Sequence, residues 1–118
     1  MIQRAIVLYL HVHQPFRIRH YTIFEAGQNH DYFDAGPGSR ENNAEIVRKV
    51  AEKSYLPTNE HLQRMLDTHP DFRLSMSMSG VALEQFEKYA PDVLASFQKL
   101  VATGRVEIVA ETYHHSLA

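Results

Sequence analysis

The fold is decided near the start of the chain by the stretch Leu8-Tyr9-Leu10-His11-Val12-His13-Gln14-Pro15-Phe16. The apolar run over residues 6–10 is typical of a strand that is buried on both faces, and Pro15 ends it. His11 and His13 follow where the run ends, and residues i and i+2 of an extended chain point to the same side. In parallel sheets covered by helices, ligands bind beyond the carboxyl ends of the strands. The stretch therefore predicts a binding site that contains both imidazoles.

Composition narrows the class of protein. The chain has 118 residues, of which 44% are hydrophobic and 22% charged, as in an ordinary globular domain. Its net charge of −2 argues against binding to nucleic acid or to an anionic membrane surface. It has no cysteine, which excludes a disulfide scaffold and a thiolate metal site. We see no signal peptide and no apolar run near the roughly 20 residues of a membrane span, so we expect a cytoplasmic protein.

Two further strands are predicted after the first. Residues 72–78 alternate strictly, with large apolar side chains on one face and Arg73, Ser75 and Ser77 on the other. We expect the large side chains to lie under helices. Residues 106–111 form the third strand.

Helical segments separate these strands. Asn42 and Asn43 are expected to cap the first helix. Pro57 is expected to break that helix and to begin the next, because residues before proline avoid the helical region. Further helices are predicted to open at Gly80 and Pro91, and Gly104 is placed to end the last one.

Helical crossovers between apolar strands imply parallel pairing, and hence an α/β fold. Three strands cannot close a barrel, which needs on the order of 200 residues or more. We therefore expect residues 1–118 to be the N-terminal part of a single larger catalytic domain, without an internal boundary.

The segment between residues 16 and 43 has weak periodicity but is rich in aromatic side chains, which a disordered linker would usually lack. A loop of this length inside a domain usually has a function. Its aromatic residues either pin the loop onto the body of the domain or face a ligand. They are Tyr21, Phe24, Tyr32 and Phe33.

Polar residues follow two of the three predicted strands. His11, His13 and Gln14 follow the first, and Glu111, His114 and His115 follow the third. In one parallel sheet these groups would converge on one cavity. A His-x-His pair at the end of a first barrel strand could also bind zinc in a hydrolase. His11 and His13 would then be two ligands, with His115 or Glu111 as a further one.

Several motifs together resemble glycoside hydrolase family 57. The sequence His13-Gln14-Pro15 after an apolar strand is similar to the first characteristic region of the family, and residues 111–117 are similar to the second region of its α-amylase-type members. The stretches between them agree as well, so the resemblance covers nearly the whole chain. They are Glu41-Asn42-Asn43, Tyr55-Leu56-Pro57-Thr58-Asn59-Glu60, His69-Pro70-Asp71-Phe72-Arg73 and Tyr89-Ala90-Pro91.

The resemblance implies a retaining enzyme that acts on α-glucans, by hydrolysis or transglycosylation, on an incomplete (β/α)7 barrel. Such an enzyme needs two carboxyl groups roughly 5–5.5 Å apart. In the family the nucleophile is a glutamate and the acid/base an aspartate, and both belong to regions that would lie beyond Ala118. We therefore expect no catalytic residue in this chain, no activity from the chain alone, and no cofactor.

The resemblance also implies roles for the residues that are present. His13, His11 and His115 would hydrogen-bond hydroxyls of the glucose unit being cleaved, together with Gln14, and Glu111 would support them. The expected partners are an α-glucan and the rest of the catalytic domain. Two alternatives stay open: a metal-dependent hydrolase with His11 and His13 as ligands, and a non-catalytic carbohydrate-binding or structural module.

Overall fold

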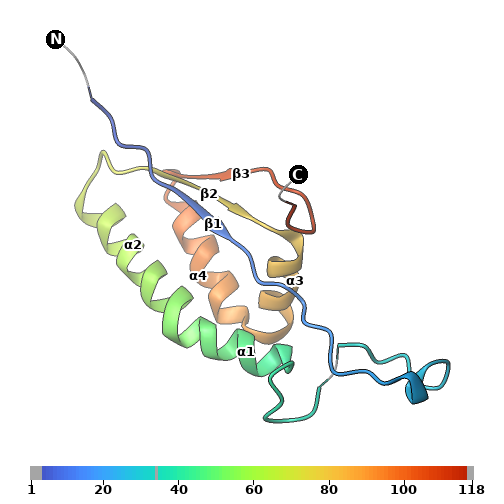
Figure 1. Cartoon of the computed structure of the whole chain (residues 1–118). Coiled ribbons are helices and arrows are strands. Elements are labelled where there is room, and N and C mark those ends of the chain that lie inside the picture. The colour runs from blue at the N-terminus through green and yellow to red at the C-terminus, as the bar shows by residue number, and fades with distance from the viewer. Residues whose placement is uncertain (1–3, 34, 117–118) are drawn as a thin grey trace.

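The structure is a computed structural model, and it describes residues 4–33 and 35–116 (Figure 1). Its three strands form one parallel sheet in the order β1-β2-β3, with helices in the crossovers. The α/β fold with three parallel strands predicted from the sequence is confirmed. The elements, in chain order, are β1 (Tyr9–Val12), the 3-10 helix η1 (Ile23–Glu25), α1 (Asn43–Val50), the π-helical turn η2 (Ala51–Tyr55), α2 (Leu56–Thr68), β2 (Leu74–Met78), α3 (Gly80–Tyr89), α4 (Pro91–Ala102) and β3 (Val106–Val109).

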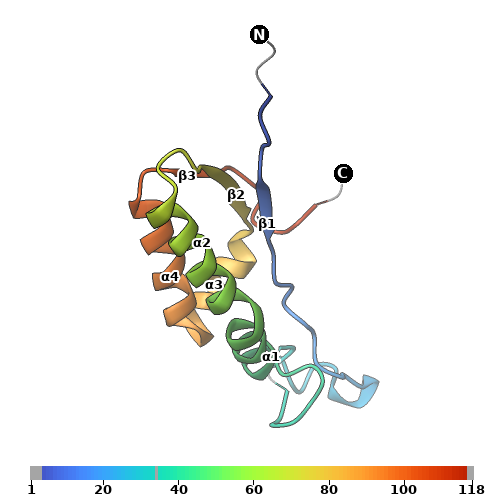
Figure 2. The same cartoon turned by 90° about the vertical axis from the view of Figure 1, so that its left-hand side faces the viewer.

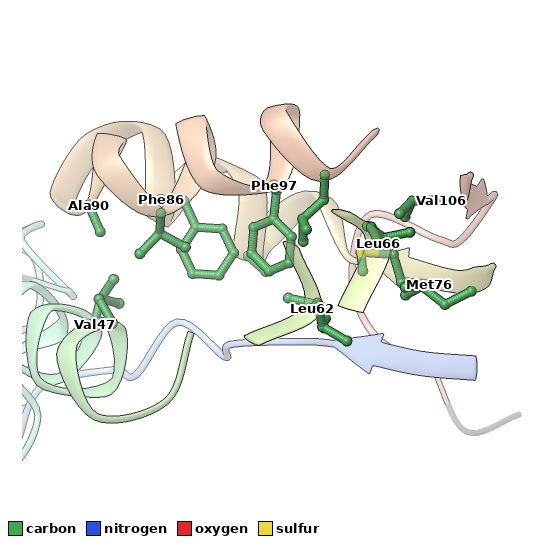
Figure 3. Close-up of a cluster of buried hydrophobic side chains, with 14 residues drawn as sticks. Val47, Leu62, Leu66, Met76, Phe86, Ala90, Phe97 and Val106 are labelled. Carbon is green, nitrogen blue, oxygen red and sulfur yellow. The ribbon is translucent and has the colours of Figure 1, made fainter. Parts of the chain in front are cut away.

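The helices cover one face of the sheet and form a second layer (Figure 2). The hydrophobic core lies between the layers (Figure 3), where Leu74 and Met76 of β2 are buried beneath the helices. The rings of Phe86 and Phe97 stack with their centroids 5.9 Å apart. Burial of each such side chain contributes about 1.5–3 kcal/mol. The expected placement of the large side chains of β2 under helices is confirmed.

The opposite face of the sheet is polar. Ser77 projects from β2 onto this face, and its hydroxyl lies 2.6 Å from the Tyr9 hydroxyl and 2.8 Å from Nδ1 of His11. The register explains these contacts, because β1 and β2 pair with His11 opposite Ser77. Among the described residues, no helix packs on this face. The sheet therefore separates an apolar core from a polar surface that carries the first predicted histidine.

The first strand differs from its prediction. It begins at Tyr9 instead of residue 6, and the Ile6 side chain is 100% exposed and that of Val7 82% exposed. The expectation that this run is buried on both faces is wrong for the described chain. The physical reason is that, among the described residues, β1 pairs with β2 alone and the helices cover a single face of the sheet (Figure 2), which leaves this run without a covering layer. The third strand is also shorter than predicted and ends at Val109.

The predicted break at Pro57 is also wrong. Helix α1 continues through η2 into α2, and the Leu56 N–H donates to the carbonyl of Ala51, five residues earlier. Proline lacks an N–H, and its ring clashes with the carbonyl four residues back in a regular α-helix. A π turn widens the helix at this point and accommodates the ring. Pro57 does lie in the first turn of α2, as expected.

The predicted cap at Asn42 and the predicted stop at Gly104 are confirmed. The side chain of Asn42 caps α1 by accepting from the Glu45 N–H at 3.0 Å. Gly104 follows α4 with φ of +73°, a conformation that side chains disfavour. No helix in the described part of the chain is long and apolar enough to cross a membrane.

The long loop is pinned to the body through Asn43, which is buried at the start of α1. The Asn43 amide accepts from the Arg17 N–H at 2.8 Å and donates to the Arg17 carbonyl at 2.9 Å and to that of Phe33 at 3.3 Å. Aromatic pairs add to this, with Phe16 against Phe33 and Tyr21 against Tyr32, each at 5.2 Å. At least part of the aromatic content therefore serves to fold the loop.

Candidate functional site

Four predicted site residues come together at the carboxyl ends of β1 and β3. The His115 ring centroid lies 4.5 Å from that of His11 and 4.8 Å from that of His13. The Glu111 carboxylate lies 3.2 Å from Nδ1 of His115 and 3.5 Å from Nδ1 of His11. We call these four residues the imidazole cluster. The convergence expected from the parallel sheet is present.

Two serines from the central strand region orient the first two histidines. Nδ1 of His11 lies 2.8 Å from Oγ of Ser77, and Nδ1 of His13 lies 2.7 Å from Oγ of Ser79. A hydrogen bond at one ring nitrogen fixes the orientation of an imidazole and leaves Nε2 for a ligand. Sequence reasoning placed Ser77 on the correct face but did not identify either serine as a site residue. The alternation of the strand was the signal that could have found them.

Glu111 is the anionic member of the imidazole cluster. Its side chain is 12% exposed, and its Oε2 is shielded from solvent without a hydrogen bond among the described residues. Partial burial raises the pKa of this carboxyl, but the hydrogen bond from His115 and the charges of the two neighbouring imidazoles outweigh it, so the pKa lies below its ordinary value. Glu111 is therefore ionised at neutral pH.

His13 is the most strongly perturbed imidazole. Burial lowers the pKa of His13, and the charges of His115 and His11 lower it further, while Glu111 acts in the opposite direction. His13 is therefore neutral at neutral pH, when one ring nitrogen can donate a hydrogen bond and the other can accept one.

Tyr113 holds the chain after β3 against the start of α3. The Val81 N–H donates to the Tyr113 carbonyl at 3.1 Å, and the Tyr113 hydroxyl hydrogen-bonds the Glu84 carboxylate. The tyrosine ring lies against Gly80, where a Cβ atom would overlap it. These contacts fix the backbone between Glu111 and His115. No pattern in the sequence indicated the contact with Gly80.

A groove with a volume of about 940 Å³ extends from the imidazole cluster toward the long loop. His13, His114 and His115 line it, together with several aromatic side chains. The volume lies within the range of small-molecule sites, roughly 300–1,000 Å³. The aromatic residues are Phe16, Phe33, Tyr89 and Tyr113.

Two strand-end residues lie outside the imidazole cluster. Gln14 is buried, its carbonyl accepts from the Gln85 amide at 2.6 Å, and its side-chain amide lies beside the guanidinium of Arg17. A role in sugar binding stays a prediction for Gln14, and its burial favours a structural one. His114 packs edge-on against Tyr113 with the ring centroids 5.0 Å apart. The last residue of the second motif, Leu117, lies outside the described residues.

The arrangement permits two kinds of chemistry. Neutral imidazoles beside a carboxylate can bind adjacent sugar hydroxyls as donors and acceptors. The cluster can also hold a metal, because one donor atom each from His11, Glu111 and His115 lies within 4.8 Å of the others. This trio differs from the expected pair of ligands, since His115 takes the place of His13.

The chain is similar to known proteins over most of its length. The model of "Glycosyl hydrolase family 57" matches residues 7–118. A protein of Methanocaldococcus jannaschii named "Putative alpha-amylase" is 42% identical over 90% of this chain, and a protein of Pyrococcus abyssi named "Alpha-amylase" is 29% identical over 58% of it. The chain spans only 22% of the former and 10% of the latter. No solved structure shows significant similarity. With the family model matched across almost all of the sequence, the chain belongs to glycosyl hydrolase family 57.

Proposed function

We propose that this chain is the N-terminal part of the catalytic barrel of a retaining glycoside hydrolase acting on α-glucans, and that it supplies part of the sugar-binding wall. The observation that carries the proposal is the convergence of three imidazoles and one carboxylate at the strand ends, beside an aromatic groove. Relatives named alpha-amylase support the substrate class.

The chemistry of the imidazole cluster fits a sugar ring. The neutral ring of His13 can donate to one hydroxyl and accept from its neighbour, and the ionised carboxylate of Glu111 holds the ring of His115 in place. Hydrogen-bond donors close to the developing alkoxide of the leaving group contribute to catalysis by stabilising negative charge, whereas a carboxylate near the ring stabilises a developing oxocarbenium ion. The aromatic faces of Phe33 and Tyr113 offer apolar surface to the faces of further sugar units.

The carboxyl pair that cleaves the bond would come from elsewhere in the protein. Retaining hydrolysis needs a nucleophile and an acid/base about 5–5.5 Å apart. Glu111 is the one carboxylate among the described residues within the imidazole cluster, and its lowered pKa suits an ion-pair partner better than a general acid. We assign it to support, and we place the nucleophilic glutamate and the acid/base aspartate beyond residue 118.

The test compares His13→Ala with His61→Ala in the protein expressed from its complete reading frame. We expect His13→Ala to lower kcat/KM for α-glucan hydrolysis by about 10²–10³-fold, the usual cost of losing one transition-state hydrogen bond. His61 is exposed on α2, away from the groove, so His61→Ala serves as the matched control and should retain near-normal activity. Equal activity of both variants would contradict a sugar-binding role for the cluster.

The residues 1–118 alone should not cleave α-glucan, because the catalytic pair is proposed to lie outside them. Cleavage by this piece would overturn that assignment. Tight glucan binding by it, without any requirement for downstream sequence, would instead favour a carbohydrate-binding module.

A further inference from the structure

We propose that His11, Glu111 and His115 form a binding site for a divalent transition-metal ion of the Zn²⁺ type, and that an ion bound there competes with the glucan. The competition rests on the proposed function, whereas the metal site itself rests on the geometry of the three side chains.

The spacing of the donor atoms is the first support. Zinc lies about 2.0–2.2 Å from nitrogen and oxygen ligands in tetrahedral sites, so two ligand atoms of one ion are about 3.3–3.5 Å apart. Oε1 of Glu111 lies 3.2 Å from Nδ1 of His115, and Oε2 of the same carboxylate lies 3.5 Å from Nδ1 of His11. With one donor atom taken from each residue, the three atoms all lie within 4.8 Å of one another. An ion would draw these atoms closer together.

The chemical identity of the donors is the second support. Two imidazoles and one carboxylate form a donor set that zinc uses with a water molecule in the fourth position. Calcium and magnesium prefer sites made of oxygen atoms alone, so two nitrogen ligands select against them. The side chains of His11 and His115 remain 34% and 29% exposed, which leaves room for water on the ion.

Metal binding would displace little of the surrounding structure. Nδ1 of His11 would exchange its contact with the Ser77 hydroxyl for the ion. Ser77 would retain the Tyr9 hydroxyl at 2.6 Å as a partner, so no buried hydroxyl would be left unsatisfied. The Glu111 Oε2 atom, which has no hydrogen bond among the described residues, would gain a ligand or a closer charge partner.

A bound ion and a bound sugar would exclude each other. The proposed function assigns the imidazoles of His11 and His115 to sugar hydroxyls, and coordination through Nδ1 would turn both rings toward the ion and away from the sugar. The expected consequence is reversible inhibition by zinc that shows mainly as a raised KM for glucan.

The binding test uses the protein from its complete reading frame, freed of metal by a chelator and titrated with Co²⁺. We expect one equivalent of Co²⁺ to give the strong visible absorption of a four-coordinate ion, and Zn²⁺ to displace it. Glu111→Gln and His115→Ala should each weaken binding by about 100-fold or more, since even an outer-shell partner of a metal site contributes 10–100-fold. His114→Ala is the matched control and should bind as the unaltered protein does. Absence of this absorption, or its persistence in both cluster variants, would overturn the proposal.

An activity measurement separates the failure of this inference from that of the proposed function. Zinc should raise KM for glucan in the unaltered protein and in the control His61→Ala, and a chelator should restore it. A metal-free protein that hydrolyses glucan but shows no cluster-dependent Co²⁺ band would refute the metal site and leave the function standing. Cluster-dependent Co²⁺ binding by a protein inactive on glucan would refute the function alone. Binding without any effect on KM would refute the competition.

Discussion

At the scale of single residues, the Asn43 side chain joins the first turn of α1 to the loop before it. Its three hydrogen bonds satisfy backbone groups of Arg17 and Phe33. Asn43→Asp retains the acceptor but loses both donated bonds, which are part-buried, and a typical hydrogen bond contributes about 0.5–1.5 kcal/mol. We expect chemical denaturation to show a loss of stability of this order. Gln28→Ala, an exposed change in the same loop, should stay within about 0.5 kcal/mol, and equal stability of both variants would contradict the anchoring role.

His13 makes stability depend on pH in a definite direction. Its pKa is lowered in the folded chain, chiefly by burial, so the unfolded chain binds the proton first as the pH falls through about 6.5. The free energy of unfolding should therefore decrease over this range. The lowered pKa of Glu111 also makes the free energy of unfolding decrease as the pH falls. That effect begins only below its ordinary pKa of 4.5, outside the pH range in which His13 titrates.

Thermal unfolding between about pH 8 and about pH 5 checks this dependence. His13→Asn, which cannot titrate, should flatten the curve near pH 6, whereas His114→Ala should leave the slope unchanged. A slope that survives in His13→Asn would assign the dependence to another group.

Predictions about single residues were correct where they depended only on neighbouring residues in the sequence. The i, i+2 rule placed His11 and His13 on one side, as the structure confirms. The serine partners could not be derived in the same way. They depend on the register that sets His11 opposite Ser77, and register is fixed by packing across the sheet.

At the scale of elements, the contact between α3 and the segment after β3 sets the position of half the imidazole cluster. Alanine at Gly80 would normally stabilise a helix by about 1 kcal/mol relative to glycine. Here its Cβ would overlap the Tyr113 ring, so Gly80→Ala should displace the chain from Glu111 to His115. We expect faster amide exchange in that segment and a raised KM for glucan.

A matched control and a second substitution make this test specific. Gly36→Ala adds the same methyl group where nothing lies within 4 Å, and it should leave both measurements unchanged. Tyr113→Ser removes the overlapping ring, so its effect should be non-additive with that of Gly80→Ala. Strict additivity of the two changes would show that the ring contact does not transmit the effect.

The type of each element, helix or strand, was predicted well, and the residues at which the elements begin and end were predicted less well. Helix caps at Asn42 and Gly104 depend on local chemistry and were confirmed. The continuation through Pro57 was missed, because a π turn that accommodates proline is rare. The first strand was placed too early, since an apolar run specifies burial only where a second layer exists.

At the scale of the whole molecule, the described chain is less compact than a closed domain. Its radius of gyration is 17.8 Å, whereas a compact domain of this length has about 13–14 Å. The chain before β1 and the long loop extend away from the layered body (Figure 1). Helices cover one face of the sheet, and the outer edges of β1 and β3 are unpaired among the described residues. This is the arrangement expected if further strands continue the sheet.

The exposed apolar run before β1 gives the last prediction. Val7 is 82% exposed in this structure, so Val7→Lys should change the stability of residues 1–118 by no more than about 0.5 kcal/mol. It should also reduce their self-association in sedimentation experiments, because lysine beside an open strand edge opposes pairing between copies. In the protein from the complete reading frame, a proposed barrel would bury this position, and the unpaired ammonium would cost several kcal/mol. Ala95→Lys on the exposed side of α4 should be neutral in both proteins. A Val7→Lys variant as stable as the unaltered complete protein would contradict the proposal that this run becomes buried inside a larger barrel.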